Sequence, residues 1–143
     1  MGLWKKLFSN EDRDRVDYYE EGLQLMGVGK YHEALTSLRL ALREDPQDAT
    51  VLQQIAITYT RIGMTDEAIK TYRSVLDKDP ASSGAHYGIA FLMLKEGRSA
   101  EAMDHLRSFL SNPPSGPEAQ RHITHARETL AQLAGEARSS DAV

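Results

Sequence analysis

The sequence predicts an all-α protein, a solenoid of antiparallel helix pairs with about seven helices. Two observations carry this prediction: an internal repeat with a constant period, and apolar residues at helical three-and-four spacing inside each period. Three stretches align without a gap, namely GKYHEALTSLRLALREDP, GMTDEAIKTYRSVLDKDP and GRSAEAMDHLRSFLSNPP.

Identical residues hold the repeat in register. The sequence numbers of Gly29, Gly63 and Gly97 differ by 34 at each step (63 − 29 and 97 − 63). The same interval relates five further sets of identical residues: Glu33, Glu67 and Glu101; Ala34, Ala68 and Ala102; Arg39, Arg73 and Arg107; Leu42, Leu76 and Leu110; Pro46, Pro80 and Pro114. The chain therefore divides into an amphipathic segment (1–12) and a repeat region (13–116) whose units span 15–48, 49–82 and 83–116.

Each unit is predicted to be a helical hairpin, as the second unit illustrates. Its first helix carries Leu52, Ile55, Ala56 and Tyr59 at helical spacing, and its second carries Ala68, Ile69, Tyr72, Val75 and Leu76. Gly63 supplies the permissive backbone for the turn between them, and Pro80 closes the unit. The paired helices are expected to approach closely at small residues: Gly22, Ala56 and Ala90 on first helices, and Ala34, Ala68 and Ala102 on second ones.

Period, small-residue spacing, glycine turn and closing proline together resemble the tetratricopeptide repeat, from Arg15 to about Pro114. The resemblance implies a right-handed superhelix whose first helices line a concave groove, where partner peptides usually lie. The first unit departs from the family at Glu21, where the other units have Ile55 and Ile89.

After the repeats, residues 117–136 are predicted to form a capping helix that closes the solenoid. Pro117 and Glu118 are a helix-start signal, and one apolar stripe follows: Ala119, Ile123, Ala126, Leu130 and Leu133. We expect residues 137–143 to be a disordered tail.

Composition argues against catalysis, cofactors and nucleic acid. The net charge of −4 gives the chain no general attraction for nucleic acid, and the absence of cysteine excludes disulfides, thiolate metal sites and thiol nucleophiles. His32, His86 and His105 face no evident serine or carboxylate partner in the sequence. His122 and His125 are one turn apart but have no third ligand nearby, so we predict no metal site and no enzyme.

The sequence instead favours a protein-binding scaffold or adaptor. Residues one turn from the packing stripe of the first helices should point into the groove: Tyr19, Leu23 and Met26; Gln53, Ile57, Thr60 and Arg61; Tyr87, Phe91, Leu94 and Lys95. Leu23, Ile57 and Phe91 keep the interval of the repeat and predict an apolar row along the groove centre.

Family members that clamp a carboxylate place lysine, asparagine and arginine in the groove. The matching residues here are Tyr19, Leu23, Gln54, Gly84 and Gly88, so clamp function is not expected. The groove should instead take an apolar or amphipathic segment of another protein, with Arg61 and Lys95 at one rim facing an acidic flank of that ligand.

An alternative remains open, in which the groove is filled by the protein's own terminal segment or by a second copy in a homo-oligomer. The first residues, MGLWKKLFSN, bear on it, because Leu3, Trp4, Leu7 and Phe8 cluster on one side of a helical wheel. This segment either packs on the protein itself, docks weakly on a membrane or partner, or is disordered. No stretch resembles a secretory signal or a membrane span, and we expect a cytoplasmic protein.

Overall fold

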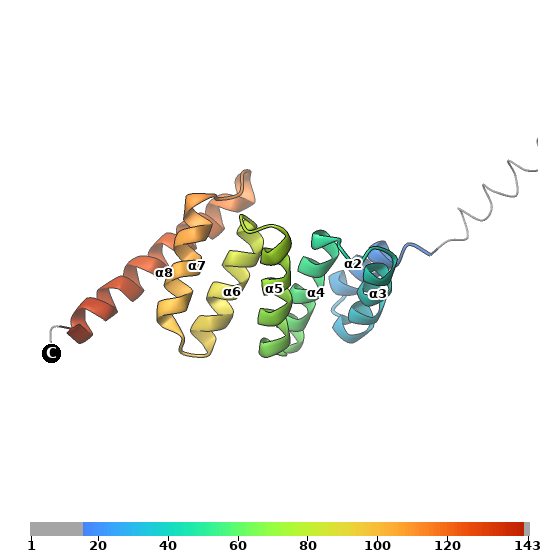
Figure 1. Cartoon of the computed structure of the whole chain (residues 1–143), viewed down its shortest axis with the longest axis horizontal. Helices are drawn as coiled ribbons and strands as arrows, with labels where there is room; N and C mark the ends of the chain where they lie inside the picture. The colour runs from blue at the N-terminus through green and yellow to red at the C-terminus, as the bar shows by residue number, and fades with distance from the viewer. Residues whose placement is uncertain (1–15, 142–143) are drawn as a thin grey trace, which may run out of the picture.

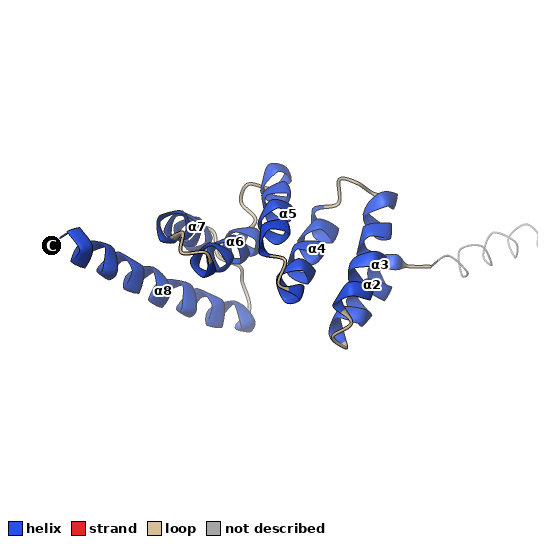
Figure 2. Ribbon diagram, turned by 90° about the horizontal axis from the view of Figure 1, so that it is seen from below, coloured by secondary structure: helices blue, strands red, loops and turns tan. Residues whose placement is uncertain are grey.

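The computed structural model describes residues 16–141, which form seven helices joined by short loops and contain no strand. The helices are α2 (Tyr18–Gly27), α3 (Tyr31–Glu44), α4 (Ala49–Ile62), α5 (Thr65–Lys78), α6 (Ser83–Lys95), α7 (Ser99–Ser111) and α8 (Pro117–Asp141). They stack in chain order into an elongated array (Figure 1), and the view at right angles shows α5 offset from α4, with α8 running below α6 and α7 (Figure 2). The predicted all-α solenoid is confirmed.

The turn inside each unit repeats in its hydrogen bonds as well as in its sequence. Gly29, Gly63 and Gly97 have φ values of 79°, 92° and 77°, a region that a residue without Cβ adopts freely. In each unit the N–H of the next residue donates, at 2.9 Å, to the carbonyl oxygen five residues earlier: Lys30 to Leu25, Met64 to Tyr59, and Arg98 to Met93. These bonds satisfy a carbonyl that the helix end leaves free.

The first helices begin at side-chain caps. Asp17 Oδ1 accepts from the N–H of Glu20 at 3.0 Å, and Asp48 Oδ1 accepts from those of Thr50 and Val51 at 2.9 and 3.2 Å. Ser82 Oγ caps α6 in the same way, accepting from Ala85 at 3.3 Å. The unit-closing prolines lie in the loops between units, after the preceding helix has ended.

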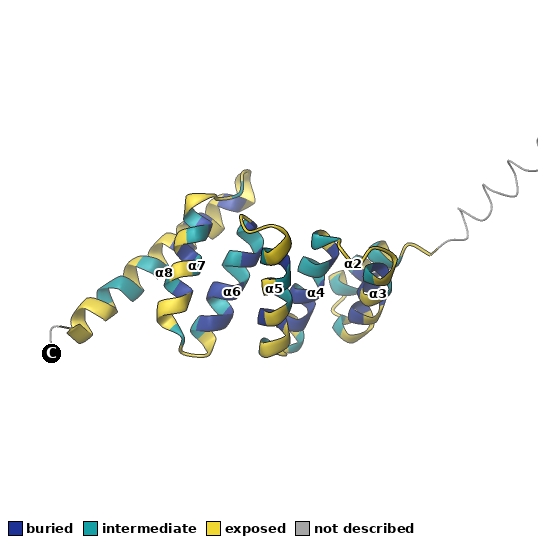
Figure 3. Cartoon of the chain, viewed as in Figure 1, coloured by how far each residue is buried: buried dark blue, intermediate teal, exposed yellow. Residues whose placement is uncertain are grey.

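The core lies between successive helices, and the predicted close approaches are its most buried positions (Figure 3). The small residues are wholly inaccessible: Ala34, Ala56, Ala68, Ala90 and Ala102. A Cβ added at Gly22 would meet the Leu38 side chain at 2.8 Å, so in the first unit only glycine fits this approach. Glu21, the residue that departs from the repeat pattern, is exposed on α2.

The last helix differs from the prediction at its end. α8 continues to Asp141, so residues 137–141 are helical rather than a disordered tail. Gln132 Nε2 donates to Glu136 Oε1 at 3.1 Å across one turn, and Glu136, Ala137 and Arg138 are good helix formers. The far half of α8 extends beyond α7 (Figure 1). Within the described part of the chain, no helix is long and apolar enough to cross a bilayer.

Candidate functional site: a groove along the first helices

Two adjoining cavities lie along α4 and α6 and together form a groove. One has a volume of about 480 Å³ and reaches α8, and the other has about 570 Å³ and follows α6 towards its C-terminal end. Both are lined by the same five central residues: Ile57, Arg61, Tyr72, Tyr87 and Gly88. We call this surface the central groove.

Seven of the predicted groove residues line these cavities: Gln53, Ile57, Thr60, Arg61, Tyr87, Phe91 and Lys95. The other four lie elsewhere. Met26 and Leu94 pack against the hydrophobic core, and the Thr58 hydroxyl donates to Met26 Sδ at 3.3 Å. Leu23 is half-buried on α2, and Tyr19 lines a separate hollow described below. The structure therefore gathers the predicted residues of the second and third units except Leu94, and leaves out those of the first.

Two glycines of α6 shape the floor of the groove. A Cβ at Gly88 would lie 2.4 Å from Tyr72 Cζ, and a Cβ at Gly84 would lie 2.3 Å from Gln53 Nε2. Because these positions lack side chains, Tyr72 of α5 and Gln53 of α4 lie against the α6 backbone. Burial raises the pKa of Tyr72 to about 12, outweighing a hydrogen bond with Thr60 and the charge of Arg61. Burial also raises the pKa of Tyr87, so both phenols are neutral near pH 7.

The far wall of the groove comes from α8. The Tyr87 hydroxyl is 2.9 Å from His125 Nδ1, and the His125 ring stacks on Phe91 at 4.6 Å between centroids with an interplanar angle of 8°. His122 lines the smaller cavity and lies 4.9 Å from the Tyr87 ring. These two histidines, which the sequence suggested only as a weak metal pair, therefore pack on the aromatic residues of the third unit.

A signal for this wall is present in the sequence. His125 follows Phe91 by the interval of the repeat, in register with Leu23 and Ile57, and Ile123 follows Ile89 in the same way. Ile89 and Ile123 are both buried. The capping helix thus continues the repeat in the place of a further first helix, and His125 corresponds to Phe91 of the third unit.

His86 and His105 form a pair on α6 and α7. Their Nδ1 atoms are 3.0 Å apart, and His86 Nε2 is 2.8 Å from the Pro80 carbonyl oxygen. Burial, then the proximity of His86 and Arg73, lowers the pKa of His105. The pair lies outside both cavities, and no group of three or more metal-ligating side chains occurs among residues 16–141.

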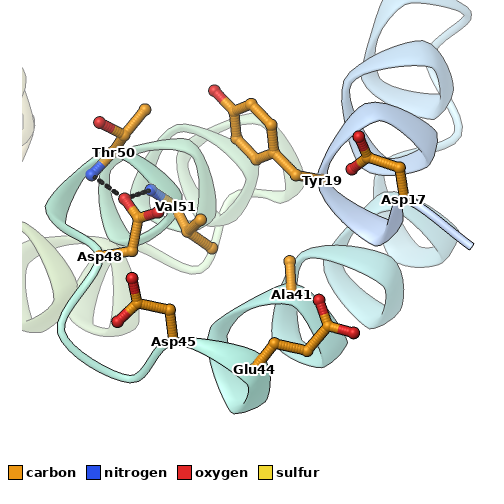
Figure 4. Close-up of a pocket in the computed structure, with 8 residues that line it drawn as sticks. All are labelled: Asp17, Tyr19, Ala41, Glu44, Asp45, Asp48, Thr50 and Val51. Carbon is orange, nitrogen blue, oxygen red and sulfur yellow. Dashed lines mark hydrogen bonds between the residues drawn. The ribbon is translucent and has the colours of Figure 1, made fainter. Parts of the chain in front are cut away.

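A separate hollow of about 240 Å³ lies where α2, α3 and α4 meet (Figure 4). Its carboxylates come from Asp17, Glu44, Asp45 and Asp48, around the ring of Tyr19. Asp17 and Asp48 cap helices, and Asp45 accepts from the N–H of Gln47 at 3.3 Å. Helix capping and turn formation account for these three acids without a ligand.

The amphipathic residues Leu3, Trp4, Leu7 and Phe8 lie outside the described part of the chain. Their predicted docking role stays a prediction.

Comparison with known proteins agrees with this architecture. A family model for the tetratricopeptide repeat matches residues 63–122. No curated protein sequence matches the chain significantly. This part of the chain therefore matches the tetratricopeptide repeat in sequence.

Solved structures with the same fold include peptide-bound chaperones. The type III secretion chaperone SycD of Yersinia enterocolitica, in complex with a peptide of the translocator YopD, superposes with a TM-score of 0.78 at 20% identity, over 83% of this chain and 91% of that one. PcrH in complex with the chaperone-binding region of PopD gives a TM-score of 0.75 at 17% identity, over 83% of this chain and 90% of that one.

YrrB, described as a tetratricopeptide repeat protein with an unusual peptide-binding site, gives a TM-score of 0.68 at 22% identity. That match covers 78% of this chain and 55% of YrrB. At these identities the likenesses establish the shared fold.

Proposed function

We propose that this protein is a non-catalytic interaction scaffold that binds an apolar or amphipathic segment of another protein in the central groove. The observation that carries this proposal is the lining of the two adjoining cavities, in which Ile57, Tyr87 and Phe91 present apolar surface beside the floor at Gly84 and Gly88. Structures of the same fold hold peptides of partner proteins, which supports the same use here.

The energetics favour modest affinity. Burying two or three apolar anchors contributes on the order of 1.5–3 kcal/mol each before the costs of association and of ordering the peptide. We therefore expect dissociation constants on the order of micromolar.

The test compares affinity capture by the wild-type protein with capture by two groove variants, Ile57→Asp and Thr60→Asp. Thr60 is exposed and lines the larger cavity, so its substitution tests the groove without disturbing the packing of the core. Lys70→Asp, at an exposed position of α5 outside both cavities, is the matched control. Partners should be lost with both groove variants and kept with the control. Retention of every partner by both groove variants contradicts the proposal.

One observation favours a second candidate, in which the protein covers part of its own groove. His122 and His125 of α8 contact Tyr87 and Phe91, so the third unit's aromatic surface is shared with the terminal helix. If the remaining surface is covered by a second copy, light scattering after size exclusion should show a dimer for the wild type. Ile57→Asp should then be monomeric.

A further inference from the structure

The central groove is charged at one end only. Arg61 and Lys95 line the larger cavity at the C-terminal ends of α4 and α6, and both are exposed. Among the described residues, no aspartate or glutamate lines either groove cavity. Arg61 also borders the smaller cavity, but the remaining residues of that cavity, among them Ser83, Pro114 and His122, include neither lysine nor arginine.

Neither basic side chain forms an ion pair within residues 16–141, where the cations in ion pairs are Arg98 and Arg107. Glu96 follows Lys95 in sequence, but its carboxylate lies 3.5 Å from Arg98 Nη1. Glu96 also lines a different hollow, at the turn from Gly63 to Glu67. Arg61 and Lys95 are therefore not held in an ion pair by a carboxylate of the described residues.

Two effects oppose each other at this end. The C-termini of α4 and α6 each contribute roughly half a negative charge, which disfavours a nearby anion. Arg61 and Lys95 contribute two full positive charges, which exceed the two half charges of the helix ends. An anionic side chain of a ligand is thus favoured there, whereas a cationic one is repelled.

The spacing of the lining residues limits where that anion lies in the ligand. On α4 the lining residues Gln53, Ile57 and Arg61 follow one another at four-residue intervals, and on α6 so do Tyr87, Phe91 and Lys95. Four residues of helix rise about 6 Å. Side chains on one face of an extended peptide recur every second residue, at roughly 6.5 Å. Successive lining residues of each helix are therefore spaced like alternate residues of an extended peptide.

We propose that the groove selects an extended peptide with two apolar side chains two residues apart and an aspartate or glutamate two residues beyond them. Arg61 and Lys95 hold this carboxylate, while the apolar pair lies at the levels of Gln53 and Ile57. Gln53, whose amide lies against Gly84, is placed to bond the peptide backbone. This inference rests on the proposed function, since it names the ligand of the same groove.

The probe is an array of acetylated serine-based decapeptides with the pattern apolar–Ser–apolar–Ser–X. The apolar positions sample Leu, Ile, Val, Met, Phe and Tyr, and X is Glu, Gln or Lys. The array is read with the wild type, with Arg61→Glu/Lys95→Glu, and with Lys70→Glu/Lys78→Glu. The last variant makes the same change in net charge at exposed positions of α5 outside the groove.

For the wild type we expect binding in the order Glu, Gln, Lys, with about three- to tenfold between Glu and Lys in solution titrations of the best peptides. This preference should shrink at 0.5 M salt. The Arg61→Glu/Lys95→Glu variant should reverse the order, and the α5 variant should keep it.

Three results contradict the inference, and they differ in what else they contradict. Equal binding of Glu, Gln and Lys peptides, sensitive to Ile57→Asp, removes the acidic preference but leaves groove binding intact. An acidic preference that persists in Arg61→Glu/Lys95→Glu shows that residues other than Arg61 and Lys95 hold the carboxylate. If the wild type binds no peptide more strongly than the Ile57→Asp variant does, both the inference and the proposed function are contradicted.

Discussion

Gly88 determines how closely Tyr72 can pack on α6. An added Cβ would lie 2.4 Å from Tyr72 Cζ and 2.7 Å from its hydroxyl oxygen, distances at which something must move. Tyr72 is only 5% exposed, and its ring is held between α4 and α6. Tyr72 therefore has little room to move, and the groove floor depends on the absence of a side chain at Gly88.

We predict that Gly88→Ala lowers the free energy of unfolding by about 1–3 kcal/mol, because overpacking outweighs the better helix propensity of alanine. The matched control is Gly135→Ala in α8, where nothing lies within 4 Å of the added Cβ. This control should raise stability by about 0.5–1 kcal/mol. Urea unfolding followed by circular dichroism measures both, and equal effects of the two substitutions contradict the packing argument.

The His86–His105 pair makes stability depend on pH. Burial, His86 and Arg73 lower the pKa of His105, whereas the nearby carboxylates of Asp104 and Glu101 oppose this. Because the folded-state pKa is lowered below the unfolded value, the unfolded chain takes up the proton first. The stability that this histidine contributes is fully present above a pH of about 6.5. It is lost as the pH falls through the folded-state pKa of His105.

His105→Gln should therefore weaken the loss of stability between pH 7.5 and pH 5.5. Unfolding free energies measured at these two pH values for the wild type and the variant give the comparison. His32→Gln, at an exposed position of α3, controls for simple removal of a histidine. An identical fall in stability for the wild type and His105→Gln argues against the pair as its source.

At the scale of elements, α8 does more than cover the end of the stack. Ala119, Ile123 and Ala126 are buried in a cluster with Ala90, Leu106 and Phe109, and Leu130 and Leu133 pack against it. The residues from Glu136 to Asp141 are exposed. The helix as far as Leu133 thus supplies the packing, and the part from Glu136 onward adds little to the core.

Ile123→Ala should accordingly cost about 2–4 kcal/mol, the usual range for truncating a buried isoleucine. Deleting residues 137–143 should change the unfolding free energy by less than about 0.5 kcal/mol, since the described part of this stretch is exposed. Thermal and urea unfolding of the two variants separate these effects. A large loss from the deletion contradicts the assignment of packing to the part of α8 as far as Leu133.

The elements could be predicted from the sequence because the constant register of the repeat fixes turns, small contact residues and apolar stripes together. The groove could be predicted only in part. Tyr72 lies on α5, the second helix of its unit, whereas the groove was predicted from first helices. Its place in the floor depends on the space left by Gly88, which periodicity alone does not reveal. Leu94 lies three residues after Phe91 yet packs on the core, since a small rotation about the helix axis separates groove from interior.

At the scale of the whole molecule, substantial contacts join mainly consecutive helices, with a smaller set between α4 and α6. In such an array each element is stabilised by its immediate neighbours. The central helices have neighbours on both sides, whereas α2 and the far half of α8 do not in the described chain.

Amide hydrogen exchange should therefore be slowest in α4 to α7 and faster in α2 and after about residue 130 of α8. Mass spectrometry of peptic fragments gives this profile directly. Uniform protection along residues 16–141 contradicts the nearest-neighbour description.

The N-terminal residues 1–9 remain the subject of a prediction from sequence. Their deletion should lower the melting temperature or change the oligomeric state if they pack on the protein. If they dock on a membrane, the deletion should abolish binding to liposomes and leave stability unchanged. Disorder predicts neither effect.

His125 continues the repeat interval of Leu23, Ile57 and Phe91, and α8 occupies the place of a further first helix. A surface made by repetition can be lengthened by gene duplication without inventing a new interface. A second copy of residues 83–116 inserted before Pro117 would meet α7 on one side and α8 on the other, the same neighbours that the natural junction already joins. The insertion would then add one more pair of neighbouring first helices, of the kind that line the central groove.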